Sequence, residues 1–79
     1  MPYTPELIEE MNILAQYNLH TTQEGLKVHA SASAESIKAT RRLYDKGLVT
    51  QPDGGYLTHL GREVAEHVQA TLAILKDQR

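Results

Sequence analysis

The sequence predicts a small, mostly helical α+β domain. Most of the chain repeats its apolar residues at helical spacing, and one stretch around Asp53 changes to short β-rich runs on either side of a turn. With 79 residues, the chain has room for a single domain over residues 1–79. It contains no Cys, Trp or Phe, so we expect a small aliphatic core without disulfides.

The first helix is expected over residues 5–17. Thr4 is a suitable N-cap, and Pro5 suits the first helical position because its missing N–H has no partner there. The apolar residues of one helix face follow at helical spacing: Leu7, Ile8, Met11, Leu14 and Ala15. Two further apolar residues, Ile13 and Tyr17, lie off that stripe.

Two more helices are expected before the β-rich stretch. Thr21 and Glu24 have the spacing of a capping box, which predicts a short helix over residues 22–30. Ser33 is a suitable cap for the next helix, over residues 34–46. Gly47 then stands where a left-handed residue commonly ends a helix.

A hairpin and a long helix complete the predicted order. Residues 48–58 form a two-stranded hairpin, because Asp53-Gly54-Gly55 supplies the positive φ angles that a tight turn needs. Thr58 is expected to cap the last helix, over residues 59–77. Its apolar stripe is longer than so small a core requires.

The motifs Leu43-x-x-x-Gly47-Leu48-Val49 and Leu57-Thr58-x-x-Gly61 flank the short hairpin. In this order and spacing the chain resembles the winged helix-turn-helix domains of MarR-type bacterial regulators. The whole chain also resembles a small uncharacterised bacterial family described only by an expected DNA-binding role. The resemblance implies a winged helix with a two-stranded wing and a cytoplasmic transcriptional regulator. Its helix over 34–46 would read duplex DNA.

The middle of the chain carries the residues that such a contact would use. Lys38, Arg41 and Arg42 share one face of the helix over 34–46. We expect Lys38 and Arg41 to reach base edges or phosphates and Arg42 to reach a phosphate, while Ser33 and the helix N-terminus meet another. The other interpretation is a solvated face with local pairs, Arg41 with Asp45 and Glu35 with Lys38.

A protein-interaction module is the alternative function. The net charge is −2, and the turn Pro52-Asp53-Gly54-Gly55 carries no Lys or Arg to enter a minor groove. A winged-helix scaffold that contacts another protein, and no DNA, is consistent with both facts.

A homodimer is expected from the surplus of apolar residues on the first and last helices. In regulators of the MarR type the terminal helices commonly form the dimer, which the resemblance carries over to this chain. The residues expected at that interface are Ile13, Tyr17, Val68, Leu72 and Leu75.

Enzymatic and metal chemistry find no support in the sequence. It has no Cys nucleophile, no Gly-rich phosphate loop and no Gly-x-Ser-x-Gly elbow. Its four histidines include no pair at the i,i+4 spacing of a helical zinc site. We therefore expect no enzyme, no cofactor and no metal, and the sequence indicates no particular small-molecule ligand. No apolar run is long enough for a membrane span, so no membrane partner is expected.

Overall fold

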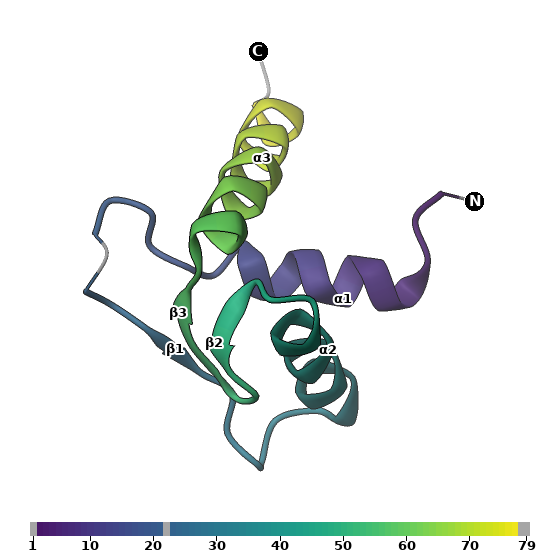
Figure 1. Cartoon of the computed structure of the whole chain (residues 1–79). Coiled ribbons are helices and arrows are strands. Elements are labelled where there is room, and N and C mark those ends of the chain that lie inside the picture. Colours follow the sequence, from purple (N-terminus) through teal and green to yellow (C-terminus); the bar gives the residue numbers. More distant parts are fainter. Residues whose placement is uncertain (1, 22, 78–79) are drawn as a thin grey trace.

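The computed structural model describes residues 2–21 and 23–77. These residues form a mostly helical α+β domain, as predicted, with three helices and one three-stranded antiparallel sheet (Figure 1). In chain order the elements are α1 (Pro5–Leu14), β1 (Leu26–Lys27), α2 (Ala34–Asp45), β2 (Val49–Gln51), β3 (Gly54–Leu57) and α3 (His59–Lys76).

Each helix begins at the hydroxyl residue that the sequence indicated. The side-chain oxygens accept backbone N–H groups three residues on: Thr4 from Leu7 at 3.2 Å, Ser33 from Ser36 at 3.1 Å, and Thr58 from Gly61 at 3.0 Å. α1 ends at Leu14, three residues before the expected end, and α2 is followed by a glycine with φ of +78° at Gly47. Local chemistry therefore sets where the helices start.

The prediction of a helix over residues 22–30 is wrong, because residues 26–27 form β1 and no helix occurs in residues 23–33. Thr22 lies outside the described residues. The Thr21 hydroxyl accepts the N–H of Gln23 at 3.1 Å, and the Glu24 carboxylate accepts Asn18 Nδ2 at 3.2 Å. The Thr21 and Glu24 side chains thus make separate contacts in the connection between α1 and β1.

The sheet has the order β1-β3-β2, so the expected two-stranded hairpin gains a third strand. β2 pairs with β3 around the expected turn, and Leu26 of β1 pairs with Gly55 of β3. A Cβ atom at Gly25 would lie 2.9 Å from the Gly55 carbonyl oxygen, so the glycine permits this close approach. The element directly before α2 is the strand β1, followed by a turn, and not a helix. The described residues therefore contain no helix-turn-helix.

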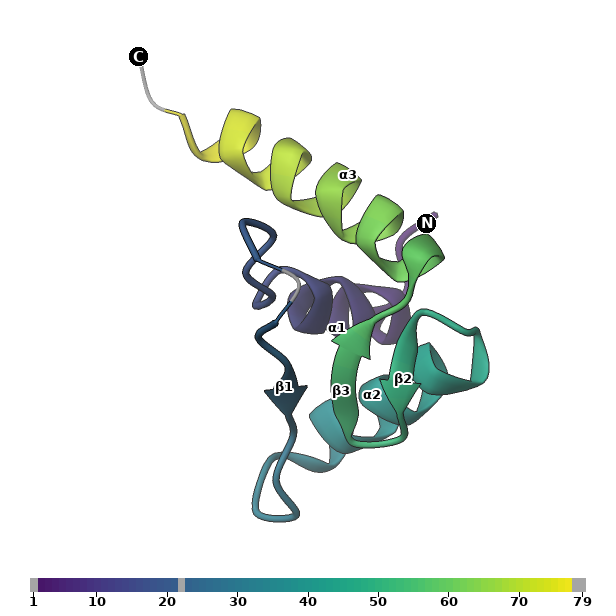
Figure 2. The same cartoon turned by 60° about the vertical axis from the view of Figure 1, so that its left-hand side comes forward.

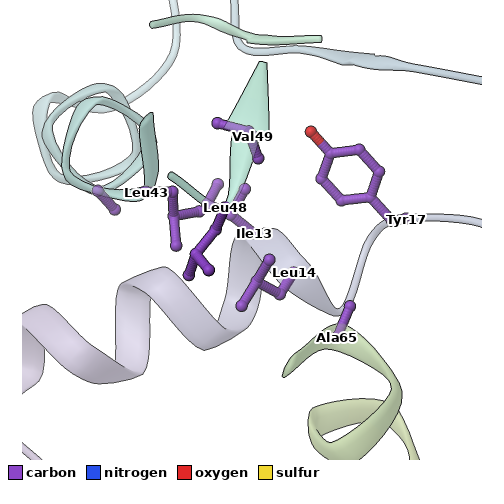
Figure 3. Close-up of a cluster of buried hydrophobic side chains, with 8 residues drawn as sticks. Ile13, Leu14, Tyr17, Leu43, Leu48, Val49 and Ala65 are labelled. Atoms are coloured by element: carbon purple, nitrogen blue, oxygen red, sulfur yellow. The ribbon is translucent and has the colours of Figure 1, made fainter. Parts of the chain in front are cut away.

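The core lies where α1, α2, the sheet and the first half of α3 meet (Figure 3). Its buried members are Ile13, Leu14, Tyr17, Ala39, Leu43, Leu48, Val49 and Ala65. Gly61 brings α3 so close to the hairpin that a Cβ atom there would collide with the Leu48 carbonyl. The start of α3 therefore lies against the backbone of Leu48, the residue before β2.

α3 is longer than the body that it covers. Its first half packs against α1 and β3, while its C-terminal turns extend beyond the other elements (Figures 1 and 2). Residues 70–76 are all exposed. The apolar surplus that the sequence indicated in the last helix therefore lies on this projecting end.

Candidate nucleic-acid interface

α2 divides its side chains between the core and solvent. Ala39, Thr40 and Leu43 are buried against the rest of the domain. Lys38 and Arg41 are exposed on the other side of the helix. Because residues three apart are neighbours on a helix surface, Lys38 and Arg41 form one outward basic pair.

Arg41 has only a weak local partner. Its Nε lies 3.6 Å from Oδ1 of Asp45, and the two side chains are 65% and 61% exposed. An exposed pair at this spacing contributes about 0.3–0.5 kcal/mol, so Arg41 can exchange Asp45 for another anion at little cost. Among the described residues no ion pair joins Glu35 to Lys38.

Arg42, expected at a phosphate, lies elsewhere. Its Nε donates to Oε2 of Glu10 at 2.8 Å, and its NH2 group donates to the Glu6 carbonyl at 3.1 Å. Only 31% of the side chain is exposed. The structure therefore turns Arg42 toward α1 and away from the outward face, because Glu10 needs a cationic partner there.

Glu10 joins α1 to α2 through two cations. Its side chain is 7% exposed, and Lys46 Nζ contacts Oε1 while Arg42 contacts Oε2. Burial alone raises the pKa of the Glu10 carboxyl, but the hydrogen bonds from Lys46 and Arg42 outweigh burial and hold that pKa below its ordinary value. Glu10 therefore stays ionised and keeps both cations on the α1 side of α2.

Sequence reasoning missed this ion cluster, although one signal was visible. Glu10 stands three residues after Leu7 and four before Leu14, so it falls on the apolar stripe of the first helix. A carboxylate in a core-facing stripe indicates that a cation will be brought to it. The sequence does not say which one.

Ser33 lies exposed at the N-terminus of α2, where the expected phosphate contact requires it to be. Its Oγ accepts the Ser36 N–H and donates to Ser36 Oγ at 3.0 Å. The hydroxyl is thus already engaged in the helix cap. What the helix start offers to an anion is its remaining backbone N–H groups and its dipole.

The turn between β2 and β3 lies beside the outward face of α2. A shallow groove separates them, lined by Val28, Ile37, Thr40, Arg41, Pro52 and Asp53. The Asp53 carbonyl accepts the Val28 N–H at 2.8 Å, which ties the turn to the chain that leaves β1. The helix and the turn thus form one surface, and the only charge at the turn is acidic.

Two of the residues expected at a dimer interface are inside the domain. Ile13 and Tyr17 are 2% and 5% exposed, and the Tyr17 hydroxyl donates to the Gly55 carbonyl at 3.2 Å. Burial and the nearby charge of Asp53 raise the pKa of Tyr17 to about 12. These side chains lie off the stripe because α1 is covered on more than one side.

The remaining interface candidates lie along α3. Val68 is half-buried against the core, whereas Leu72 and Leu75 are 39% and 74% exposed. Exposure therefore rises steadily toward the end of the helix. Of the five expected interface residues, Leu72 and Leu75 are the ones whose exposure lets them meet a partner without unpacking the domain.

The described part of the chain brings no three His, Asp or Glu side chains together as metal ligands. All four histidines are exposed: His20 and His29 lie in the connections around β1, and His59 and His67 lie eight residues apart on α3. No helix among residues 2–21 and 23–77 has the length and apolarity to cross a membrane.

Comparison with known proteins identifies one family. A model described as a family of unknown function (DUF5669) matches residues 1–76. No curated protein and no solved structure matches the chain significantly. The comparisons thus provide no link to MarR-type regulators.

Proposed function

The chain belongs to the DUF5669 family, and we propose that it binds duplex DNA through the outward face of α2 as a transcriptional regulator. One observation carries the proposal. Lys38 and Arg41 project from the same exposed face of a capped 12-residue helix that has its other side in the core. A helix held in this way can lie in a major groove without any change in the domain.

The arrangement around α2 supports the same contact. α2 leads directly into the β2–β3 hairpin, which lies beside its outward face, and α3 follows. This order is similar to that of winged-helix regulators, where helix and wing meet adjacent grooves. The similarity is an analogy at the level of the fold, and it supports the proposed role.

Each basic residue has a distinct expected role. Arg41 gives up its exposed pair with Asp45 and reaches a guanine edge or a phosphate, and Lys38 reaches a neighbouring phosphate. The N-terminal turn of α2, capped by Ser33, accepts a further phosphate. Arg42 takes no part, because it is held by Glu10.

The charge of this surface makes the contact weak for a single copy. Glu35, Asp45 and Asp53 lie beside the two cations. Two phosphate contacts per copy give a salt slope of about −2, far below that of a protein with a continuous basic surface. We therefore expect weak but measurable binding at low salt and a gradual loss of affinity as the salt concentration rises.

A salt series with mixed genomic duplex fragments tests the proposal, with binding followed by fluorescence anisotropy. Arg41→Gln should weaken binding by about 1–3 kcal/mol, and Lys38→Gln should reduce the salt slope by about one unit. Glu35→Gln is the matched control on the same face, and it should strengthen binding because it removes a repulsive charge. No duplex affinity at low salt, or equal affinity for all three variants, would refute the proposal.

A protein-interaction module is the second candidate, and a specific observation favours it. Ile37 and Tyr44 on α2 are each 39% exposed, and the cations of this face are matched by Glu35 and Asp45. A mixed apolar and charge-balanced helix face suits a protein partner. This candidate predicts no duplex binding at any salt concentration, so the same assay separates the two.

A further inference from the structure

We propose that two copies of the chain associate through the C-terminal half of α3, with the two helices antiparallel. The proposal starts from a stripe of small and apolar residues on α3 that continues beyond the part of the helix packed against the rest of the domain. Its residues alternate spacings of four and three: Gly61, Ala65, Val68, Leu72 and Leu75. That spacing is the one by which two helices pack along a common seam.

The burial of the stripe changes along the helix. Gly61 and Ala65 are buried against the chain's own body, and Val68 is half-buried. Leu72 and Leu75 continue the same stripe in solvent, at 39% and 74% exposure. The first part of the seam is thus covered by the body, whereas Leu72 and Leu75 do not belong to the core or to the residues packed against it.

The projecting end is apolar on more than the stripe. Residues 70–76 read Ala-Thr-Leu-Ala-Ile-Leu-Lys, and Ile74 beside the stripe is also 74% exposed. In both views these turns lie clear of the other elements (Figures 1 and 2). A projecting apolar helix end of this kind marks an interaction site.

A second copy is the occupant that the chemistry fits. Residues 70–76 contain one charged side chain, Lys76, at their very end, so two such surfaces can pack apolar on apolar with no unpaired charge between them. A symmetric contact also covers the same residues on both copies at once.

The charges select the antiparallel arrangement. Two parallel helices would place the two Lys76 side chains together and align the helix dipoles unfavourably. Antiparallel helices with a two-fold axis near Leu72 put the two Lys76 groups at opposite ends of the seam. Leu75 of one copy then lies over the Val68 region of the other.

The contact is short, so the dimer is expected to dissociate in the micromolar range, as small interfaces do. It does not rest on DNA binding, and its test contains no DNA. Failure of the dimer and failure of the proposed function are therefore distinguishable.

Sedimentation of the full chain from about 10 to 500 µM tests the association. We expect concentration-dependent dimers for the unmodified chain and a dissociation constant at least tenfold higher for Leu75→Glu. The 74% exposure of Leu75 means that this change leaves the fold intact. Leu60→Glu is the matched control, because Leu60 is also exposed on α3 but lies about 22 Å along the axis from Leu75. It should leave dimerisation unchanged. A monomer at all concentrations, or an undisturbed Leu75→Glu dimer, overturns the proposal.

Single cysteines test the orientation, since the natural chain has none. Near the two-fold axis, Leu72→Cys should cross-link on mild oxidation. Leu75→Cys should not, because the two residues would lie about 10 Å apart along the antiparallel axis, beyond disulfide reach. Preferential cross-linking of Leu75→Cys would show parallel helices and overturn the arrangement. Cross-linking of neither variant would place the seam elsewhere and overturn it as well.

Discussion

α2 and its C-cap residue Lys46 carry four cations within nine residues, and the fold uses them in two different ways. Arg42 and Lys46 turn inward to Glu10, where their partner is 7% exposed. Lys38 and Arg41 turn outward, and the only ion pair they make among the described residues is an exposed one. The inward pair contributes to stability, whereas the outward pair is what remains for a ligand.

The difference shows why counting charges along a sequence overstates a binding surface. Residues 20–50 have more bases than acids, yet two of the bases belong to an acid outside that segment. A buried carboxylate must be paired, so Arg42 and Lys46 are held by Glu10 and are not available to a ligand. The surface left for DNA therefore holds two cations of α2 instead of four.

Glu10→Ala should remove the common partner of Arg42 and Lys46 and have the largest effect on stability. Two cations lose their common partner, but both retain access to water, so the free energy of unfolding should fall by about 2 kcal/mol, below the range for a fully buried pair. Urea denaturation measures the change. Glu9→Ala, one residue away and outside the ion pairs of the described residues, should change stability by less than about 0.5 kcal/mol. Equal losses in the two variants would contradict the inward role.

Acid should produce a smaller form of the same loss. The pKa of Glu10 is lowered in the folded state, so its contribution is fully present above the ordinary pKa of a glutamate, 4.5, and is lost as pH falls through the lower folded value. Protonation leaves the side chain in place, so less is lost than in Glu10→Ala. Denaturation curves from pH 6 to about pH 3 should show a decline that is shallower in Glu10→Gln. Parallel declines in the two proteins would show that other carboxylates govern acid stability.

Arg42→Ala and Arg41→Ala compare the two sets directly. Arg42→Ala should lower the free energy of unfolding by about 1–2 kcal/mol, because Glu10 keeps only Lys46. Arg41→Ala should change it by less than about 0.5 kcal/mol, as expected for an exposed pair. Thermal or urea unfolding measures both. The order of the two values is the test, and a larger loss for Arg41 would reverse the assignment of the faces.

Local features of the fold were predictable from the sequence. Thr4, Ser33 and Thr58 cap helices with N–H groups three residues away. The hairpin turns at Pro52-Asp53, and Gly54 and Gly55 supply the positive φ angles directly after it, at the start of β3. Such features depend on neighbours in the chain and therefore appear in its order.

Features that depend on distant residues were not predictable in the same way. β1 forms because it pairs with Gly54 and Gly55 of β3. In the sequence, only the apolar residues Leu26 and Val28 on either side of Lys27 indicated a strand. The direction in which the Arg42 side chain points likewise depends on Glu10, 32 positions earlier. Neighbouring residues alone placed Arg42 outward, since they do not show which face α1 covers.

Asp45→Asn should have the smallest effect on stability and sharpens the contrast from the outward side. The pair with Arg41 is exposed at both ends, so its removal should lower the free energy of unfolding by about 0.3–0.5 kcal/mol. The same change frees the guanidinium and removes a negative charge from the surface proposed to face DNA. Duplex affinity at low salt should therefore rise while stability falls slightly, and the gain should disappear in the double variant Asp45→Asn, Arg41→Gln. Anisotropy titrations paired with urea denaturation measure both quantities in one set of samples. An affinity gain that survives without Arg41 would mean that Asp45 acts on duplex DNA by general repulsion, and Arg41 would lose its assigned role at the base edges.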